Sequence, residues 1–497
     1  MGVHQSQKKL FAFSIDLDRR VRGDHPLRRV SQTIDFEFIR KEVEQFYGNN
    51  GNVSVDPVVI LKLMFLLFWD DVKSERTLMR TLPERLDYLW FLGFDLDDEV
   101  PNHSVLSKAR QRWGEGVFEE LFIRVVSQCV DQGLVEGSKI HVDSSLIDAN
   151  ASKDSVATGT PEVIARYREV TQAVAAKLDD TTVTPGRVAT NDTHVSTTDP
   201  DATLVRRAGS SSRPRYHHHR AVDDKHGVIT AVETTTGSIA EDHKLGDLVD
   251  QHEANTEEKV DTVVADSKYG TISNFISCEK KAIRSHFKSQ ADKGAHCGRR
   301  EGIFGEDRFK FDSNSNTYTC PAGEIMRSRR LHSRRQTYEY VTSRGVCDAC
   351  ELRAQCTRSK TGRSLRRHRE QDTLNRAIQH SKSEEARKDL KRRMTLIEGS
   401  FGNASNNHHF KRSRWRRLWR QQIQDYLIAT IQNVKLLLRH NAYVGRADAQ
   451  VVSRPYVSRI VRGMVLPTSI LAISMPLEPL KLQWQRESKR SQFFSLS

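Results

Sequence analysis

Residues Ser138–Ser155 read SKIHVDSSLIDANASKDS, and this segment gives the first evidence for the fold of the chain. The short run over 139–142 is typical of a β-strand, and we expect that strand to end on Asp143. A strand that ends on a carboxylate places an anionic oxygen at the edge of a sheet, where a divalent cation can bind. Alone this is weak evidence, because an Asp at the end of a strand is common.

A second copy of the pattern gives it weight. Residues 261–270 read DTVVADSKYG, in which an apolar strand leads into Asp266. Helix, strands and helix are expected between the two aspartates, which predicts an α/β sheet. We therefore expect both carboxylates at one edge of that sheet.

A third carboxylate, Glu398, follows in RRMTLIEGSFGN on a predicted helix. The spacing of Leu390, Met394, Ile397 and Phe401 predicts one apolar stripe, with Glu398 at its edge. Two aspartates at strand ends and a late helical glutamate suit a two-metal site for phosphoryl transfer.

Hard oxygen ligands favour Mg²⁺ or Mn²⁺ at such a site. We expect Asp143 to bridge two ions, Asp266 to bind one of them and Glu398 the other. Each carboxylate alone would more often be a turn or cap residue. Glu384 and Glu385 are the alternatives to Glu398.

Composition sets the broad class. The chain has 497 residues, enough for two or three domains, and carries a formal net charge of +14 from 78 basic and 64 acidic residues. This excess favours a polyanionic partner. The longest apolar run, Val58–Trp69, is interrupted by Lys62 and is too short to cross a membrane. No signal-peptide pattern opens the chain, so we expect no membrane association and a cytoplasmic protein.

The domain organisation follows from shifts in pattern. We expect a flexible basic arm over 1–30, an all-α domain for DNA binding or dimerisation over 31–135, a catalytic α/β domain over 136–440 and a poorly ordered tail over 441–497. A Cys- and Arg-rich insertion covers 296–370. Within the all-α domain, the helices near 74–82 and 102–113 have two interpretations. They bind DNA or a second subunit, or they only pack in the core.

Four cysteines of the insertion, Cys320, Cys347, Cys350 and Cys356, read CP…CDAC…C. This grouping suggests a structural Zn²⁺ site of four thiolates in a reducing compartment. The alternatives are free thiols in a small packed module, or replacement of one ligand by Cys297 with His296.

Basic and aromatic residues alternate after Glu398. The DNA-binding candidates in this cluster are Lys411, Arg412, Arg414, Trp415 and Arg416. The alternative is a solvated charged face. Tyr269 is expected beside the site or against DNA, whereas adjacent residues of a strand point to opposite faces, so His217–His219 cannot all bind one ion and are expected to be structural.

With these residues in view, the chain resembles the DDE transposases of bacterial insertion sequences, in the group with a helical N-terminal domain and a cysteine-bearing insertion. The matching segments, in order, are DPVVILKLMFLLF, HVDSSLIDANASKDS, STTDPDATL, YHHHRAVDDKHGVITAV, VVADSKYGTISN, CPAGE with CDACELRAQC, and IEGSFGN.

The resemblance implies a ribonuclease-H-like catalytic core in which Asp143, Asp266 and Glu398 are the three acids. It also implies a nucleoid-associated homodimer on paired element ends, acting on terminal inverted repeats and target DNA. Hydrolysis would free a 3′-OH that attacks the target. The alternatives are an inactive DNA-binding relic or repressor, and a ribonuclease-H-like nuclease without strand transfer.

The chain departs from the family at one place. A basic residue is usual six or seven positions after the glutamate, where this sequence has Ala404 and Ser405. Lys411 and Arg412 come later. This departure puts one expected DNA contact in doubt.

Overall fold

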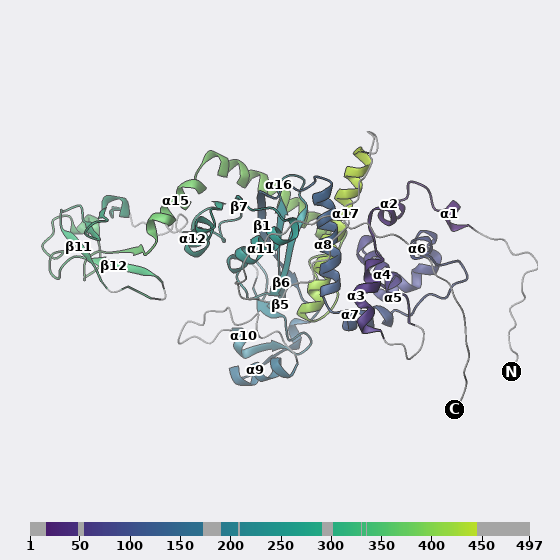
Figure 1. Cartoon of the computed structure of the whole chain (residues 1–497). Helices are drawn as coiled ribbons and strands as arrows, with labels where there is room; N and C mark the ends of the chain where they lie inside the picture. Colours follow the sequence, from purple (N-terminus) through teal and green to yellow (C-terminus); the bar gives the residue numbers. More distant parts are fainter. Residues whose placement is uncertain are drawn as a thin grey trace, which may run out of the picture. The chain divides into compact units, whose positions relative to one another are not determined.

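The computed structural model describes residues 16–47, 54–171, 190–206, 209–290, 302–329, 331–333 and 335–444, and the statements below refer to these residues. They form a mixed α/β structure with a helical N-terminal region (Figure 1). No helix among them is long and apolar enough to cross a membrane. The predicted tail lies outside the described residues from 445 onward, and its first residues belong to the last helix.

The N-terminal region is built around α4 (Pro57–Trp69), which contains the longest apolar run of the sequence. The Asp56 carboxylate accepts a hydrogen bond from the Val58 amide at 2.9 Å, and Pro57 fills the first helical position. Because α4 is apolar on nearly all sides, it lies at the centre of the domain. The surrounding helices are α1 (Leu17–Arg20), α2 (Pro26–Thr33), α3 (Phe38–Val43), α5 (Glu75–Thr81), α6 (Leu86–Leu92), α7 (Ser104–Trp113) and α8 (Gly116–Asp131).

The predicted flexible arm over 1–30 is wrong for its described half. Helices α1 and α2 occupy that part, and Leu27 and Val30 are buried in the core shared with α4. The Arg28 guanidinium stacks over Trp90 at 4.4 Å, so a basic residue of this stretch packs rather than remaining solvated. Residues 1–15 lie outside the described part of the chain.

A six-stranded sheet forms the middle of the chain. Its main path runs β4-β5-β1-β7-β8, and β6 pairs with β5 along the same edge as β4. Strand β1 is antiparallel to β5 and parallel to β7, and β7 is parallel to β8 (Figure 1). The strands are β1 (Lys139–Asp148), β4 (Thr203–Val205), β5 (Arg213–Asp223), β6 (Ile229–Thr236), β7 (Thr262–Val264) and β8 (Arg284–His286).

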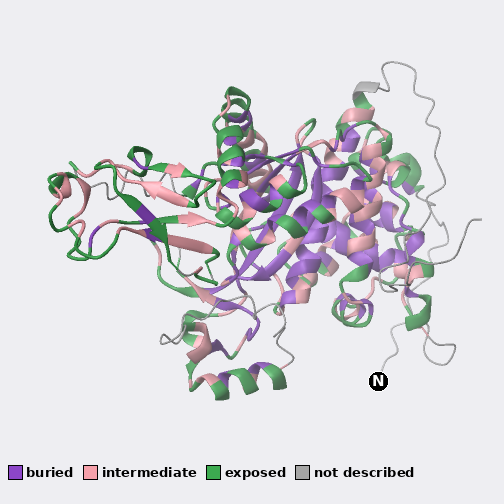
Figure 2. Cartoon of the chain, turned by 60° about the vertical axis from the view of Figure 1, so that its left-hand side comes forward, coloured by how far each residue is buried: buried purple, intermediate pink, exposed green. Residues whose placement is uncertain are grey.

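Helices cover both faces of this sheet. Helices α11 (Leu245–Thr256), α12 (Ile272–Lys280) and α15 (Gln371–Ser381) contribute to one apolar core together with Ile140 and Val142 of β1. Helices α16 (Glu384–Asn407) and α17 (Leu418–Val444) contribute to the other core, which continues into the N-terminal helices. In Figure 2 the buried residues gather on the strands and these packed helices.

Side chains of α17 also cover the outer edge of β6. The Asn433 side chain accepts from the Ile229 amide at 2.9 Å and donates to the Ile229 carbonyl at 2.7 Å. The Gln422 side chain accepts from the Thr234 amide at 2.6 Å. These bonds satisfy backbone groups that an edge strand would otherwise leave unpaired.

Two smaller parts complete the described chain. The first joins β2 (Val156–Thr158) and β3 (His194–Ser196) beside α9 (Pro161–Val170) and α10 (Thr190–Thr193). The second is a five-stranded antiparallel sheet, the cysteine module, whose side chains are mostly half-buried or exposed (Figure 2). Its elements are β9 (Lys310–Asp312), β10 (Thr317–Thr319), β11 (Ile325–Ser328), β12 (Thr337–Val341), α14 (Arg353–Cys356) and β13 (Ser364–His368).

Candidate active site

The strand register brings Asp143 and Asp266 together. The parallel pairing of β1 with β7 ends at His141 opposite Val264, so Asp143 and Asp266 each lie two residues beyond that last pair. Adjacent strands are ~4.8 Å apart. The two predicted acids therefore lie side by side at the carboxyl edge of the parallel strands.

The expectation that the first strand ends on Asp143 is wrong. Strand β1 continues to Asp148 because its antiparallel pairing with β5 persists, with Asp143 opposite Arg220. Only the parallel neighbour stops at this level. Asp143 thus lies inside a continuous strand that remains paired with β5 but no longer pairs with β7.

Asp143 is largely enclosed and paired with a cation. Burial raises the pKa of its carboxyl group, and the neighbouring carboxylates of Asp266 and Glu241 raise it further. Two contacts oppose this effect: the Arg393 guanidinium of α16 at 2.9 Å and the Ser144 amide at 2.8 Å. Arg393 therefore balances the charge of Asp143 in this structure.

Asp266 is half-buried in the turn after β7. Its carboxylate accepts a hydrogen bond from the Lys268 amide at 2.7 Å, and it forms no ion pair with any described residue. The turn passes so close to its neighbour that a Cβ on Gly270 would lie 2.0 Å from the Lys288 carbonyl oxygen. Only glycine fits there, so the turn that presents Asp266 has a fixed course.

Glu398 lies on α16, but its side chain does not form a ligand cluster with the two aspartates among the described residues. Its side chain is exposed and has no hydrogen bond or ion pair among the described residues. The predicted apolar stripe is partly wrong, because Met394 is 54% exposed while polar Asp389 is buried, as Ile397 is. Of the alternatives at the start of α16, Glu384 pairs with Lys388 of the same helix, and Glu385 pairs with Lys139 of β1 and Arg284 of β8.

Accordingly, no three His, Cys, Asp or Glu side chains in the described part of the chain already stand close enough together to hold a metal ion. The donor set near Asp143 is nonetheless made of hard oxygens, which suit Mg²⁺ or Mn²⁺.

The structure adds a buried glutamate that the sequence reasoning missed. Glu241 accepts a hydrogen bond from the Ser144 hydroxyl, next to Asp143, and pairs with Lys268, two residues after Asp266, at 2.5 Å. It thus links the two segments that carry the aspartates. The only sequence signal was its place near the second of the two helices expected between Asp143 and Asp266.

Glu241, Ser144, Lys268, His217 and Gln290 also line an open groove of about 570 Å³ beside the two aspartates. Tyr269 lies beneath this region rather than in the groove. It is fully buried, so the expected DNA contact is wrong, because no face of the ring reaches the surface. Asp143, Asp266 and Glu241 are close enough to raise the pKa of Tyr269, after burial itself.

The basic cluster after Glu398 divides into exposed and packed residues. Lys411, Arg412 and Arg416 are exposed. Lys411 donates to the Ser145 hydroxyl, two residues from Asp143 on the same side of β1. A basic side chain therefore lies near Asp143, although the usual positions hold Ala404 and Ser405.

Arg414 and Trp415 are wrong as DNA contacts, because N-terminal helices and loops already bind them. Arg414 pairs with Asp71 at 2.6 Å and stacks on Phe68 at 4.5 Å. The Trp415 indole donates to Glu75 at 3.0 Å. Arg110 of α7 lies over the same indole at 3.9 Å and is buried, so this arginine also packs.

The three histidines of β5 are structural, as expected. His217 bonds the Ile239 carbonyl at 2.9 Å and His219 bonds the Thr235 hydroxyl at 2.9 Å. His218 faces the other way and pairs with Asp425 of α17 at 2.9 Å, with both side chains fully buried.

The cysteine candidates Cys320, Cys347, Cys350 and Cys356 line one small cavity far along the chain from these acids. Cys297 and His296, the alternative ligands, lie outside the described residues.

Comparison with known proteins adds two family matches. Residues 15–112 match a transposase domain known as DUF772, and residues 319–438 match a transposase DDE domain. No curated protein matches the chain.

Among solved structures, the chain is similar to a piggyBac transposase synaptic complex with hairpin DNA, at 9% identity and a TM-score of 0.33, covering 84% of this chain and 73% of that one. It is also similar to a Mos1 transposase paired-end complex with the left transposon end, at 11% identity and a TM-score of 0.16, covering 50% and 64%. A Mos1 mariner paired-end complex with Mn matches at 10% identity and a TM-score of 0.15, covering 51% and 68%. Scores this low do not establish a shared fold.

The two family matches carry the assignment instead. They fall at the helical N-terminal region and at the segment that ends in α16 and α17, in the order that the motifs predict. The chain is a DDE-type DNA transposase.

Proposed function

We propose that Asp143, Asp266 and Glu398 are the catalytic carboxylates of a ribonuclease-H-like core that cleaves and joins DNA with Mg²⁺ or Mn²⁺. The observation that carries this proposal is the register that sets Asp143 beside Asp266 at the carboxyl edge of parallel strands. The sheet order β6-β5-β1-β7-β8, antiparallel through the first three strands and parallel through the last three, supports the assignment of the core.

Asp143 and Asp266 would hold the metal, and Glu398 would complete its ligands. A divalent ion held there would supply activation of the attacking oxygen and stabilisation of the leaving one. Arg393 pairs with Asp143 at 2.9 Å and opposes the rise that burial causes in the pKa of that carboxyl group. Arg393 and Glu398 are about 140° apart around α16, so the ligand role of Glu398 requires α16 to turn in the DNA-bound state.

The exposed basic residues Lys411, Arg412 and Arg416 are proposed to bind DNA phosphates beside the acids. Hydrolysis at the element ends then frees a 3′-OH, and this hydroxyl attacks the target DNA. We also propose that two copies act together on the paired ends. Catalysis and DNA binding would thus rest on the same face of β1.

The test is cleavage and joining of a labelled fragment that carries the element's terminal inverted repeats. Asp143→Asn, Asp266→Asn and Glu398→Gln are each expected to abolish both steps while end binding persists. Glu384→Gln is the matched control, since Glu384 is an exposed glutamate of the same helix, and its activity should equal wild type.

Three results would contradict parts of the proposal. Normal cleavage by Glu398→Gln would remove the third ligand assignment. End binding without any cleavage by wild type, even with Mn²⁺, would indicate an inactive relic or repressor. Cut DNA without joined product would indicate a nuclease.

A further inference from the structure

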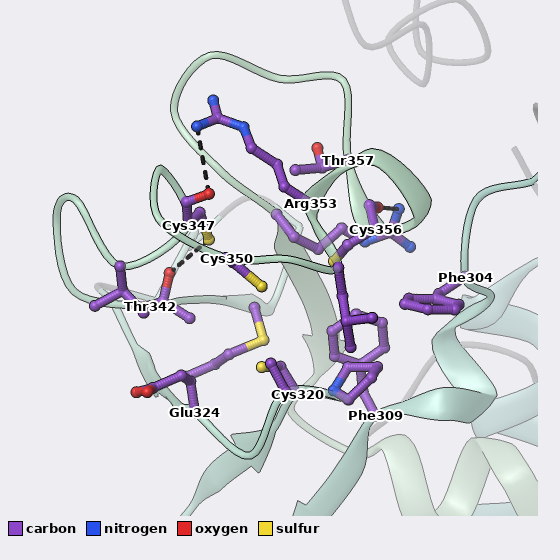
Figure 3. A pocket seen from close by; sticks show the side chains of 16 residues that line it. Phe304, Phe309, Cys320, Glu324, Thr342, Cys347, Cys350, Arg353, Cys356 and Thr357 are labelled. Atoms are coloured by element: carbon purple, nitrogen blue, oxygen red, sulfur yellow. Dashed lines mark hydrogen bonds between the residues drawn. The ribbon is translucent and has the colours of Figure 1, made fainter.

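Four cysteines from separate segments of the cysteine module converge on one cavity. Cys320 follows β10, Cys347 and Cys350 lie in the loop after β12, and Cys356 ends α14. All four line the same space of about 30 Å³, and none forms a disulfide (Figure 3). That volume is the size of one small bound species.

The cysteine module needs a cross-link between its loops because its apolar core is very small. The buried apolar residues of this core are Phe309, Met326, Tyr340 and Leu365. Modules this small rarely hold a fold by hydrophobic burial alone and are usually stabilised by disulfides or a metal. The four cysteines form no disulfide, and a metal ion bound by their thiolates would join these loops.

Charged side chains lie around the cavity. Four thiolates and Zn²⁺ carry a net charge of −2. Arg353, Arg363 and Glu324 line the same cavity, and Arg353 also pairs with the Asp348 carboxylate. Arg353 donates to the Cys347 carbonyl at 3.3 Å, and Arg363 donates to the Cys356 carbonyl at 3.4 Å. The buried Nε of Arg363 has no hydrogen-bond partner among the described residues.

The loop after α14 is shaped around one thiol. Gly362 has φ +91°, and a Cβ built on it would lie 2.9 Å from the Cys347 Sγ. The Thr342 hydroxyl lies 3.1 Å from the same sulfur (Figure 3). Contacts of this kind orient a ligand from outside the coordination sphere.

We propose that Cys320, Cys347, Cys350 and Cys356 bind one structural Zn²⁺ as thiolates and so hold the cysteine module together. No three metal-ligating side chains in the described residues already stand at ligand spacing, so the four thiols would have to move closer together within the cavity they share to bind one ion. The site is separate from the acids of the catalytic proposal and does not depend on it.

The experiment measures metal in the full chain purified under reducing conditions. We expect about one zinc per chain by elemental analysis. The Co²⁺-substituted protein should show thiolate-to-cobalt charge-transfer bands and the d–d bands of tetrahedral coordination. Zn²⁺ should also protect four thiols from a thiol reagent. These measurements need only the wild-type chain, so they stay decisive if a variant fails to fold.

Variants locate the metal. Cys350→Ser should lose zinc, and Gly362→Ala should weaken zinc binding by at least about tenfold because the added methyl displaces the Cys347 sulfur. Cys278→Ala and Asp143→Asn are the matched controls, the first for cysteine loss and the second for the acidic site, and both should retain zinc.

Two results would overturn the proposal. The first is a wild-type chain that holds no zinc and whose four thiols react equally with and without added Zn²⁺. The second is mass spectrometry of the chain, alkylated without reduction, that shows disulfides among these four residues.

Discussion

The Arg393 guanidinium lies 2.9 Å from the Asp143 carboxylate, so a cation from α16 faces an acid from the centre of the sheet. Burial and two nearby carboxylates raise the pKa of Asp143, and Arg393 is the main group that lowers it. The ion pair therefore extends the pH range in which Asp143 is charged. This relationship makes Arg393 a residue whose loss should be visible in a pH profile.

Arg393→Gln is expected to move the acidic limb of the cleavage profile to higher pH. Without the guanidinium the pKa of Asp143 rises, and each pKa unit lowers the charged fraction about tenfold on the acidic side. Cleavage of a labelled end should thus fall more at pH 6 than at pH 8. Lys391→Gln, an exposed charge change on the same helix, is the control. An acidic limb that stays at the wild-type pH would contradict this role.

Glu241→Gln tests the link between the two acid-bearing segments. The substitution removes the charge that pairs with Lys268 and weakens the hydrogen bond from Ser144. We expect cleavage to slow on the order of tenfold to a hundredfold, with end binding unchanged, because the aspartates lose a positioning residue. Single-turnover cleavage and a gel-shift assay measure the two quantities separately.

The control for this variant is Asp247→Asn, which removes an exposed carboxylate that also pairs with a lysine. If Glu241→Gln lowers end binding and cleavage together, Glu241 shapes the DNA groove instead of the catalytic step.

Lys411→Gln and Arg414→Gln should separate DNA contact from packing. The first removes an exposed charge beside β1, so the slope of log K for end binding against log salt should fall by about 1. The second leaves Asp71 without its buried partner and should lower the melting temperature while the slope stays the same. A gel shift over a salt series and thermal denaturation check the pair. Equal slopes for wild type and Lys411→Gln would remove Lys411 from the interface.

Stability should fall as the pH is lowered below neutral. Burial lowers the pKa of His218, His252 and His408 to about 4, from an ordinary value of 6.5. Between these values the unfolded chain binds protons that the folded protein does not, so the stability is complete above pH 6.5 and is lost on acidification toward pH 4. At pH 5 each of these histidines should lower the free energy of unfolding by on the order of 2 kcal/mol.

Urea unfolding at pH 7.5 and pH 5 measures this loss. His252→Gln should reduce the difference between the free energies of unfolding at the two pH values by the contribution of one histidine. His380→Gln, at an exposed position, should not change this difference. A stability that is the same at both pH values would show that these rings do not stay neutral in the folded protein.

The sequence predicted those features that depend on local pattern. Helix α4 follows from Asp56-Pro57 and an apolar run that only Lys62 interrupts. The positions of the two aspartates follow from the apolar residues before each of them, which form the paired strands β1 and β7. The orientation of Glu398 could not be read in this way, because α16 buries the polar residue Asp389 and exposes the apolar Met394. The apolar stripe therefore located only part of the buried face of α16, at Ile397 and Phe401.

Contacts between distant segments explain the remaining differences. Arg414 and Trp415 belong to a basic, aromatic run that is typical of a DNA-binding surface, yet their partners Asp71 and Glu75 come from the N-terminal region. Glu241 has no local signature, since only the folded chain brings it to Ser144 and Lys268. Such pairs become visible only once the fold is known.

The position of α17 has a consequence for how copies of this gene decay. The helix packs in the core that joins the N-terminal helices to the sheet, and it covers the edge of β6. A stop codon before residue 418 would remove α17, and with it packing contacts of both the N-terminal helices and the sheet. A shortened product should therefore not persist as a folded DNA-binding fragment. A missense change at an acid would leave the whole support intact. Only the second kind of damaged copy would yield a stable protein able to compete with active ones for the same ends.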